Sequence, residues 1–133
     1  KVILTAVLIG AVCGIVTAFV LFRSGMLRER SGAAMLLAAI AAFYPVFAVI
    51  EADPLAILLH LAIFVGFTAL ALRGFRDGLY LIAGGLIAHG IFDVGLMFTQ
   101  ITGPAWWPPF CASFDIIAGA SILRLIQTGK APR

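Results

Sequence analysis

Five apolar runs, each long enough to cross a lipid bilayer, follow one another along this chain of 133 residues. A transmembrane helix needs about 20 mostly apolar residues, and fewer suffice inside a helical bundle. Charged residues, Gly and Pro separate the runs, as expected at turns. The pattern predicts an all-α integral membrane bundle of five transmembrane helices that forms a single domain over residues 1–133. The expected spans are residues 2–22, 33–51, 55–72, 79–98 and 110–127.

The composition excludes other classes of protein. Hydrophobic residues make up 63% of the chain and charged residues 11%, whereas soluble domains contain roughly 25% charged residues. The net charge of +3 comes from basic residues in short loops rather than on one exposed face, so nucleic acid is not an expected partner. The lipid bilayer is the expected environment, and a homo-oligomer is compatible with it.

The basic residues predict an orientation. With five spans, the loop after the first span, the loop after the third span and the C-terminal tail share one side of the membrane. All basic residues except Lys1 lie in or next to these segments: Arg23, Arg28, Arg30, Arg73, Arg76, Arg124, Lys130 and Arg133. The positive-inside rule makes this side cytoplasmic, so the N-terminus is expected outside, in the bacterial cytoplasmic (inner) membrane.

The first apolar run is expected to be a retained helix, because no signal-peptide cleavage pattern precedes Arg23. The chain begins at Lys1 rather than at a methionine, so the natural N-terminus can be longer.

Five ionisable residues interrupt the apolar runs: Glu51, His60, His89, Asp93 and Asp115. A carboxylate at the centre of a membrane helix costs about 2.5–3.5 kcal/mol, so such residues indicate a functional site. At a rise of about 1.5 Å per residue, the two aspartates and His60 are expected roughly 7–9 Å below the outer boundary, with His89 near 13 Å. The i, i+4 pair His89 and Asp93 shares one helix face. We therefore predict one polar layer in the outer half of the bundle.

Simpler interpretations remain for some of these residues. Asp53 is expected to be a turn or cap residue before Pro54. Glu51 can be either a solvated helix end or a member of the site, and His60 can be an interior histidine or a ligand. Tyr44 lies on the Glu51 side of its helix, where packing is the expected role.

Two imidazoles and several carboxylates are a ligand set suited to zinc, iron or manganese. The leading hypothesis is therefore a membrane enzyme that binds a divalent metal and acts on a small or lipophilic molecule, as a hydrolase, isomerase or oxidoreductase. The candidate metal ligands are His60, His89, Glu51, Asp93 and Asp115. Three of them, Glu51, Asp93 and Asp115, are also the candidate catalytic groups.

Two alternatives need no metal. A proton-coupled small transporter could use the same residues as a relay, although the inner half of each span lacks a second polar layer. An accessory subunit of a membrane complex could use them as contacts between helices, although such hydrogen bonds contribute less than about 2 kcal/mol.

Three further features concern packing. The GxxxG spacing of Gly10 and Gly14 lets two helices approach closely, and contact within the monomer is the expected use. Pro45 removes a backbone hydrogen bond and is expected to kink the second span. Cys13 and Cys111 should lie at different depths, so no disulfide is expected between them.

Two segments near the C-terminus, AHGIFD at residues 88–93 and WWPPFC at residues 106–111, are followed by Phe114 and Asp115. They resemble the C-terminal half of an uncharacterised family of small bacterial polytopic integral membrane proteins. The resemblance covers about 30 residues. It implies a membrane fold, assigns no activity and carries over no functional residue.

Overall fold

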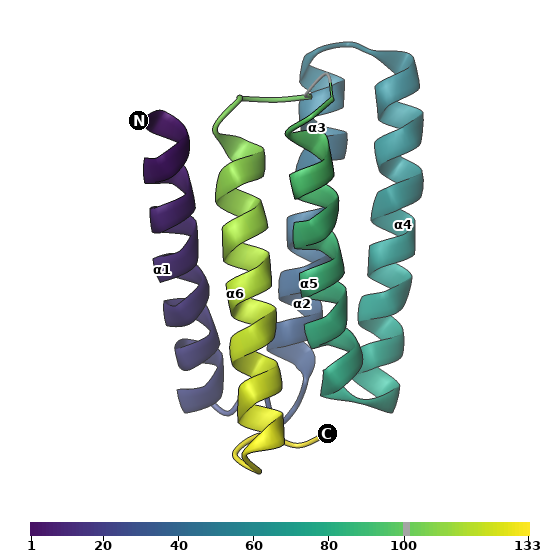
Figure 1. Ribbon diagram of the computed structural model, residues 1–133. Helices are drawn as coiled ribbons and strands as arrows, with labels where there is room; N and C mark the ends of the chain where they lie inside the picture. Colours follow the sequence, from purple (N-terminus) through teal and green to yellow (C-terminus); the bar gives the residue numbers. More distant parts are fainter. Residues whose placement is uncertain (100–101) are drawn as a thin grey trace.

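The computed structural model describes residues 1–99 and 102–133, and within these ranges the chain is helical without strands. The helices are α1 (Val2–Arg23), α2 (Ser31–Ala41), α3 (Phe43–Ile50), α4 (Pro54–Asp77), α5 (Leu79–Leu96) and α6 (Trp107–Gln127). α2 and α3 follow one another as a single membrane-length span, so five spans are long and apolar enough to cross a bilayer. The predicted all-α fold with five such spans is confirmed (Figure 1).

The helices form an elongated bundle with α1 at one edge and α4 at the other (Figure 1). α6 packs against both α1 and α5, while α4 packs against α2, α3 and α5. The two termini lie at opposite ends of the bundle, as an odd number of spans requires. Large apolar side chains such as Ile9 on α1 and Leu58 on α4 are exposed. These outer helices therefore present the apolar surface that a lipid bilayer would cover.

α1 is held to α6 through its two spaced glycines. A Cβ atom at Gly14 would lie 2.6 Å from the carbonyl oxygen of Phe114, and one at Gly10 would also collide with the α6 backbone. Only glycine allows this approach, because such contacts with backbone atoms cannot be relieved by a side-chain rotation. The prediction that the GxxxG spacing serves packing within the monomer is confirmed.

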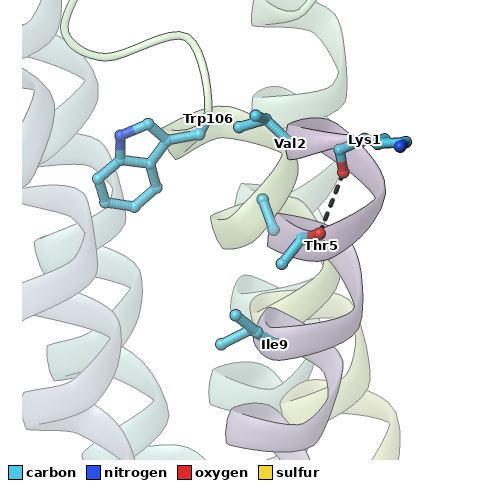
Figure 2. Close-up of a pocket in the computed structure, with 6 residues that line it drawn as sticks. Lys1, Val2, Thr5, Ile9 and Trp106 are labelled. Carbon is cyan, nitrogen blue, oxygen red and sulfur yellow. Dashed lines mark hydrogen bonds between the residues drawn. The ribbon is translucent and has the colours of Figure 1, made fainter.

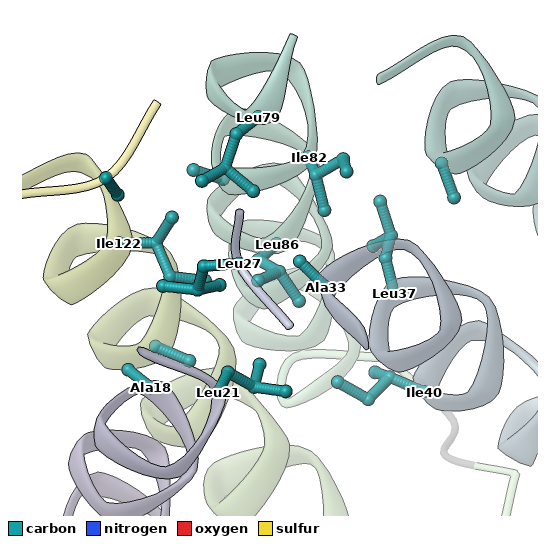
Figure 3. Close-up of a cluster of buried hydrophobic side chains, with 14 residues drawn as sticks. Ala18, Leu21, Leu27, Ala33, Leu37, Ile40, Leu79, Ile82, Leu86 and Ile122 are labelled. Atoms are coloured by element: carbon teal, nitrogen blue, oxygen red, sulfur yellow. The ribbon is translucent and has the colours of Figure 1, made fainter. Parts of the chain in front are cut away.

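An apolar core fills the end of the bundle where α1 ends and α2 begins. Figure 3 shows its side chains, which come from α1, the loop after it, α2, α4, α5, α6 and the C-terminal tail. Leu27 of that loop is buried among them, next to the helical residues Leu37, Leu86 and Ile122. All of these side chains are apolar, and the buried ionisable residues described below are not among them.

The basic segments meet at this same end. Arg30 has a left-handed backbone conformation with φ of 62°. Its guanidinium donates hydrogen bonds to the carbonyl oxygens of Phe75 at 3.3 Å, Arg76 at 3.0 Å and Arg133 at 3.2 Å. One side chain thus joins the loop after α1, the end of α4 and the C-terminal tail. The three basic segments used to predict the orientation lie together.

Two helix boundaries differ from those expected by three residues or more. α4 continues to Asp77 rather than ending near residue 72, and an i, i+4 ion pair between Arg73 and Asp77 at 3.0 Å supports its last turn. α6 begins at Trp107 rather than near residue 110, with Pro108 and Pro109 inside its first turn. Prolines fit there because the first helical N–H groups have no partner within the helix.

Two local predictions hold in the structure. The second span is interrupted at Ala42, where α2 ends and α3 begins. Pro45 has no N–H to donate to the carbonyl of Ala41, which accounts for a break at this point. Asp53 caps α4, since its side chain accepts hydrogen bonds from the N–H groups of Leu55 and Ala56.

Candidate metal centre

α5 and α6 approach closely because small residues face each other across their contact. A Cβ atom at Gly90 would lie 2.9 Å from the carbonyl oxygen of Ala112 and 3.2 Å from the Cβ of Asp115. A Cβ atom at Gly119 would lie 2.7 Å from the carbonyl oxygen of Ala83. The glycines thereby bring the polar face of α5 against α6, and this contact forms the site.

Three ionisable side chains meet in this contact, and we refer to His89, Asp93 and Asp115 as the triad. Nδ1 of His89 lies 2.7 Å from Oδ2 of Asp115 on α6 and 3.3 Å from Oδ2 of Asp93, one turn along α5. The first distance is that of a short hydrogen bond between an N–H donor and a carboxylate, whereas the second is a weaker contact. The triad side chains are 1%, 0% and 0% exposed.

The charge of the triad is poorly compensated. In the described ranges, His89 is the only basic side chain within 4.0 Å of either carboxylate. Four buried atoms have no hydrogen-bond partner in the described structure: Nε2 of His89, both oxygens of Asp93 and Oδ1 of Asp115. Buried charges are normally paired or coordinate a metal. A cation held between these side chains would satisfy the unpartnered atoms.

The triad has the dimensions of a metal site. One potential ligand atom from each residue can be chosen so that all three lie within 4.8 Å of one another. Zinc binds imidazole nitrogen and carboxylate oxygen at about 2.0–2.2 Å, so two ligands on opposite sides of an ion are about 4 Å apart. A buried His89, Asp93 and Asp115 group can thus hold one divalent ion, at the cost of small side-chain adjustments.

Aromatic rings enclose the triad histidine. Phe67 of α4 meets the His89 ring edge to face at 4.8 Å between centroids, and Phe92 of α5 lies 5.8 Å away. Tyr44 of α3 lies 6.4 Å from His89, and its hydroxyl is buried without a hydrogen-bond partner. Sequence reasoning assigned Tyr44 to packing alone. The structure places the Tyr44 ring against residues of α4 and α5 instead, near His60, His89 and Phe92.

The other two predicted site residues lie outside the triad. Glu51 ends α3 and is exposed, and its Oε1 accepts a hydrogen bond of 2.6 Å from the N–H of Gly103. His60 of α4 is buried and stacks on Tyr44, with a centroid distance of 5.3 Å and an interplanar angle of 20°. The structure thus brings His89, Asp93 and Asp115 together. His60 contacts Tyr44 instead of the triad, and Glu51 contacts the loop residue Gly103.

A shallow pocket of about 310 Å³ lies between the start of α1 and Trp106 (Figure 2). Its walls are almost entirely apolar, and the Thr5 hydroxyl inside it donates to the carbonyl oxygen of Lys1 at 3.1 Å. No triad residue lines this pocket. It is a surface recess of the apolar exterior, separate from the candidate metal centre.

Comparison of the chain with protein-family models, curated proteins and solved structures found no match. The chemistry of the triad is therefore inferred from its own residues and their surroundings.

Proposed function

We propose that this chain is an integral membrane protein that binds one divalent metal ion, zinc in the first instance, through His89, Asp93 and Asp115. The observation that carries this proposal is the pair of fully buried carboxylates with a single imidazole as partner. Two carboxylates and a neutral imidazole carry two negative charges, which a divalent cation balances. Iron and manganese accept the same donor types and are the alternatives to zinc.

The number of ligands favours a catalytic centre over a structural one. Structural zinc sites use four protein ligands, whereas catalytic sites use three and leave one position for water or substrate. The triad supplies three. With a metal in place, the centre would polarise a carbonyl or activate water. We infer a metal-dependent enzyme of the hydrolase type that acts on a small or lipophilic molecule able to enter between the helices.

The short hydrogen bond between His89 and Asp115 favours a second candidate function. At 2.7 Å, Nδ1 of His89 is placed to share a proton with Oδ2 of Asp115. A site that carries protons instead of a metal would suit a proton-coupled transporter. In that case, liposomes containing the protein and a pH-sensitive dye would show proton movement that Asp115→Asn abolishes.

Metal content decides between the two candidates. The protein is purified in detergent, stripped with a chelator, reloaded with zinc, iron or manganese, and measured by elemental analysis. We expect one bound ion per chain, lost in His89→Ala and Asp115→Asn. Asp77→Asn is the matched control, because this carboxylate is exposed and pairs with Arg73. Equal metal content in the wild type and the triad variants, or none in any of them, would refute the metal proposal.

We further propose that the end with the basic residues faces the cytoplasm of a bacterial cell and that Lys1 lies outside. The grouping of the basic segments around Arg30 supports this orientation. Single cysteines introduced at Ser24 and Ala105, both exposed, in a background without Cys13 and Cys111, would test it. A reagent that does not cross the membrane should label the cysteine at position 105 in intact cells and leave position 24 unlabelled; the reverse pattern would overturn the orientation.

A further inference from the structure

His60 and Tyr44 form a polar and aromatic extension of the triad that reaches the outermost helix. The Tyr44 ring stacks on His60 at 5.3 Å and lies 6.4 Å from the ring of His89. Phe92 closes one side of this group, at 6.0 Å from Tyr44 and 6.5 Å from His60. Both imidazoles thus lie near one tyrosine, and the three polar residues come from α4, α3 and α5.

Three polar atoms of this group are buried without hydrogen-bond partners in the described structure. They are Nδ1 of His60, the hydroxyl of Tyr44 and Nε2 of His89. Tyr44 is 2% exposed and His60 is 5% exposed. An unsatisfied buried polar atom is costly, whereas apolar side chains would fill the same space without this cost. A ligand that contacts positions 44 and 60 would supply the missing partners.

The order of the residues across the bundle suggests what that contact does. The triad lies between α5 and α6, and Tyr44 comes next. His60 lies beyond it, on a helix whose neighbouring side chains Leu59 and Leu61 are exposed. Tyr44 lies near both histidine rings and so links His60 to the triad. His60 is placed to bind the ion before or after the triad does.

We propose that His60 and Tyr44 form a transfer site through which a divalent cation reaches and leaves the triad, an inference that rests on the proposed metal function. An incoming ion exchanges a water ligand for a ring nitrogen of His60. It then leaves His60, passes the Tyr44 hydroxyl and exchanges its remaining water ligands for the triad donors. The proton of the hydrogen bond between His89 and Asp115 is displaced to water, and no electron transfer is involved. A transfer site lowers the barrier in both directions and leaves the bound state unchanged.

Exchange kinetics test this proposal. Zinc transfer between the purified protein and a chromophoric chelator is followed by stopped-flow absorbance, and equilibrium affinity is measured separately. In Tyr44→Phe and His60→Gln, association and dissociation should both slow by about tenfold, equivalent to about 1.4 kcal/mol of barrier, with affinity unchanged within about twofold. Tyr80→Phe is the matched control, because Tyr80 is the other tyrosine of the chain and is 49% exposed. Circular dichroism and gel filtration establish that each variant is folded.

Each outcome has a defined meaning. A parallel fall of both rates in the two variants, with normal rates in Tyr80→Phe, supports the transfer site. Unchanged rates with normal affinity overturn it and leave the proposed metal function intact. A weaker affinity caused by faster dissociation alone also overturns it, because the two residues would then be ligands of the bound ion. A wild-type protein that binds none of zinc, iron and manganese refutes the metal function itself, before any variant is compared.

Discussion

The two triad aspartates are expected to affect stability with opposite signs when each is replaced by leucine. Both side chains are fully buried, so the same substitution is compared in the same surroundings. Asp115 makes the 2.7 Å hydrogen bond to His89, whereas Asp93 approaches the same nitrogen only at 3.3 Å and has both oxygens unpartnered. Asp115 should therefore contribute to the stability of the metal-free protein, and Asp93 should reduce it.

The magnitudes follow from these contacts. Asp93→Leu removes two unsatisfied oxygens, each of which costs about 1–3 kcal/mol. Overpacking by the larger side chain costs about 1–3 kcal/mol, so a net stabilisation of about 1–2 kcal/mol is expected. Asp115→Leu leaves the buried imidazole of His89 with the 3.3 Å contact alone. Asp115→Leu should therefore destabilise the metal-free protein by about 1.5–3 kcal/mol, the cost of losing a hydrogen bond to a charged group.

The assay is unfolding in detergent, followed by tryptophan fluorescence, with a chelator present for the metal-free protein. In a second series with free zinc and no chelator, zinc should stabilise the wild type by about 2.7 kcal/mol at a hundredfold excess over the dissociation constant. Neither leucine variant should respond to zinc, because each lacks one of the ligands. A destabilised Asp93→Leu protein would show that Asp93 is a structural partner, and the assignment of its oxygens to a cation would fail.

Two other regions of the chain give further predictions. Gly10→Ala and Gly14→Ala should each destabilise the protein by about 1–3 kcal/mol through overpacking against α6. Gly66→Ala should be neutral or slightly stabilising in the same unfolding assay, because open space surrounds that position. Glu51→Gln should weaken the hydrogen bond to Gly103 and cost about 1 kcal/mol, while zinc affinity stays at the wild-type value. A loss of zinc binding in Glu51→Gln would return Glu51 to the metal site.

The helical spans could be predicted from the sequence because apolar length depends on composition alone. Helix ends were less certain, since a Pro pair can lie before a helix or within its first turn, as Pro108 and Pro109 do. The distance of each residue from the outer end of its predicted span correctly placed His89, Asp93 and Asp115 near one level of the bundle. The i, i+4 spacing placed His89 beside Asp93. Depth says nothing about rotation of a helix around its axis. For this reason Glu51 and His60 could not be separated from the triad before the packing of α3 and α4 was known.

Gly90 should control the geometry of the triad without contributing a donor atom. A Cβ atom at this position would lie 2.7 Å from Cγ1 of Ile116 and 2.9 Å from the carbonyl oxygen of Ala112. The second contact is with backbone, so Gly90→Ala can be accommodated only if α5 and α6 separate. The His89 to Asp115 distance would then increase, and zinc affinity should fall by about 10–100-fold, the range seen when the residues that support metal ligands are changed.

Gly84→Ala on the same helix is the control for this prediction, because no atom lies within 4 Å of a Cβ placed there. It should leave zinc affinity unchanged, and it gains helix propensity as Gly90→Ala does. The difference between the two variants then measures helix separation alone. Equal affinities in Gly90→Ala, Gly84→Ala and the wild type would mean that the triad tolerates separation of α5 and α6. Close packing of these helices would then not be what holds the metal ligands in position.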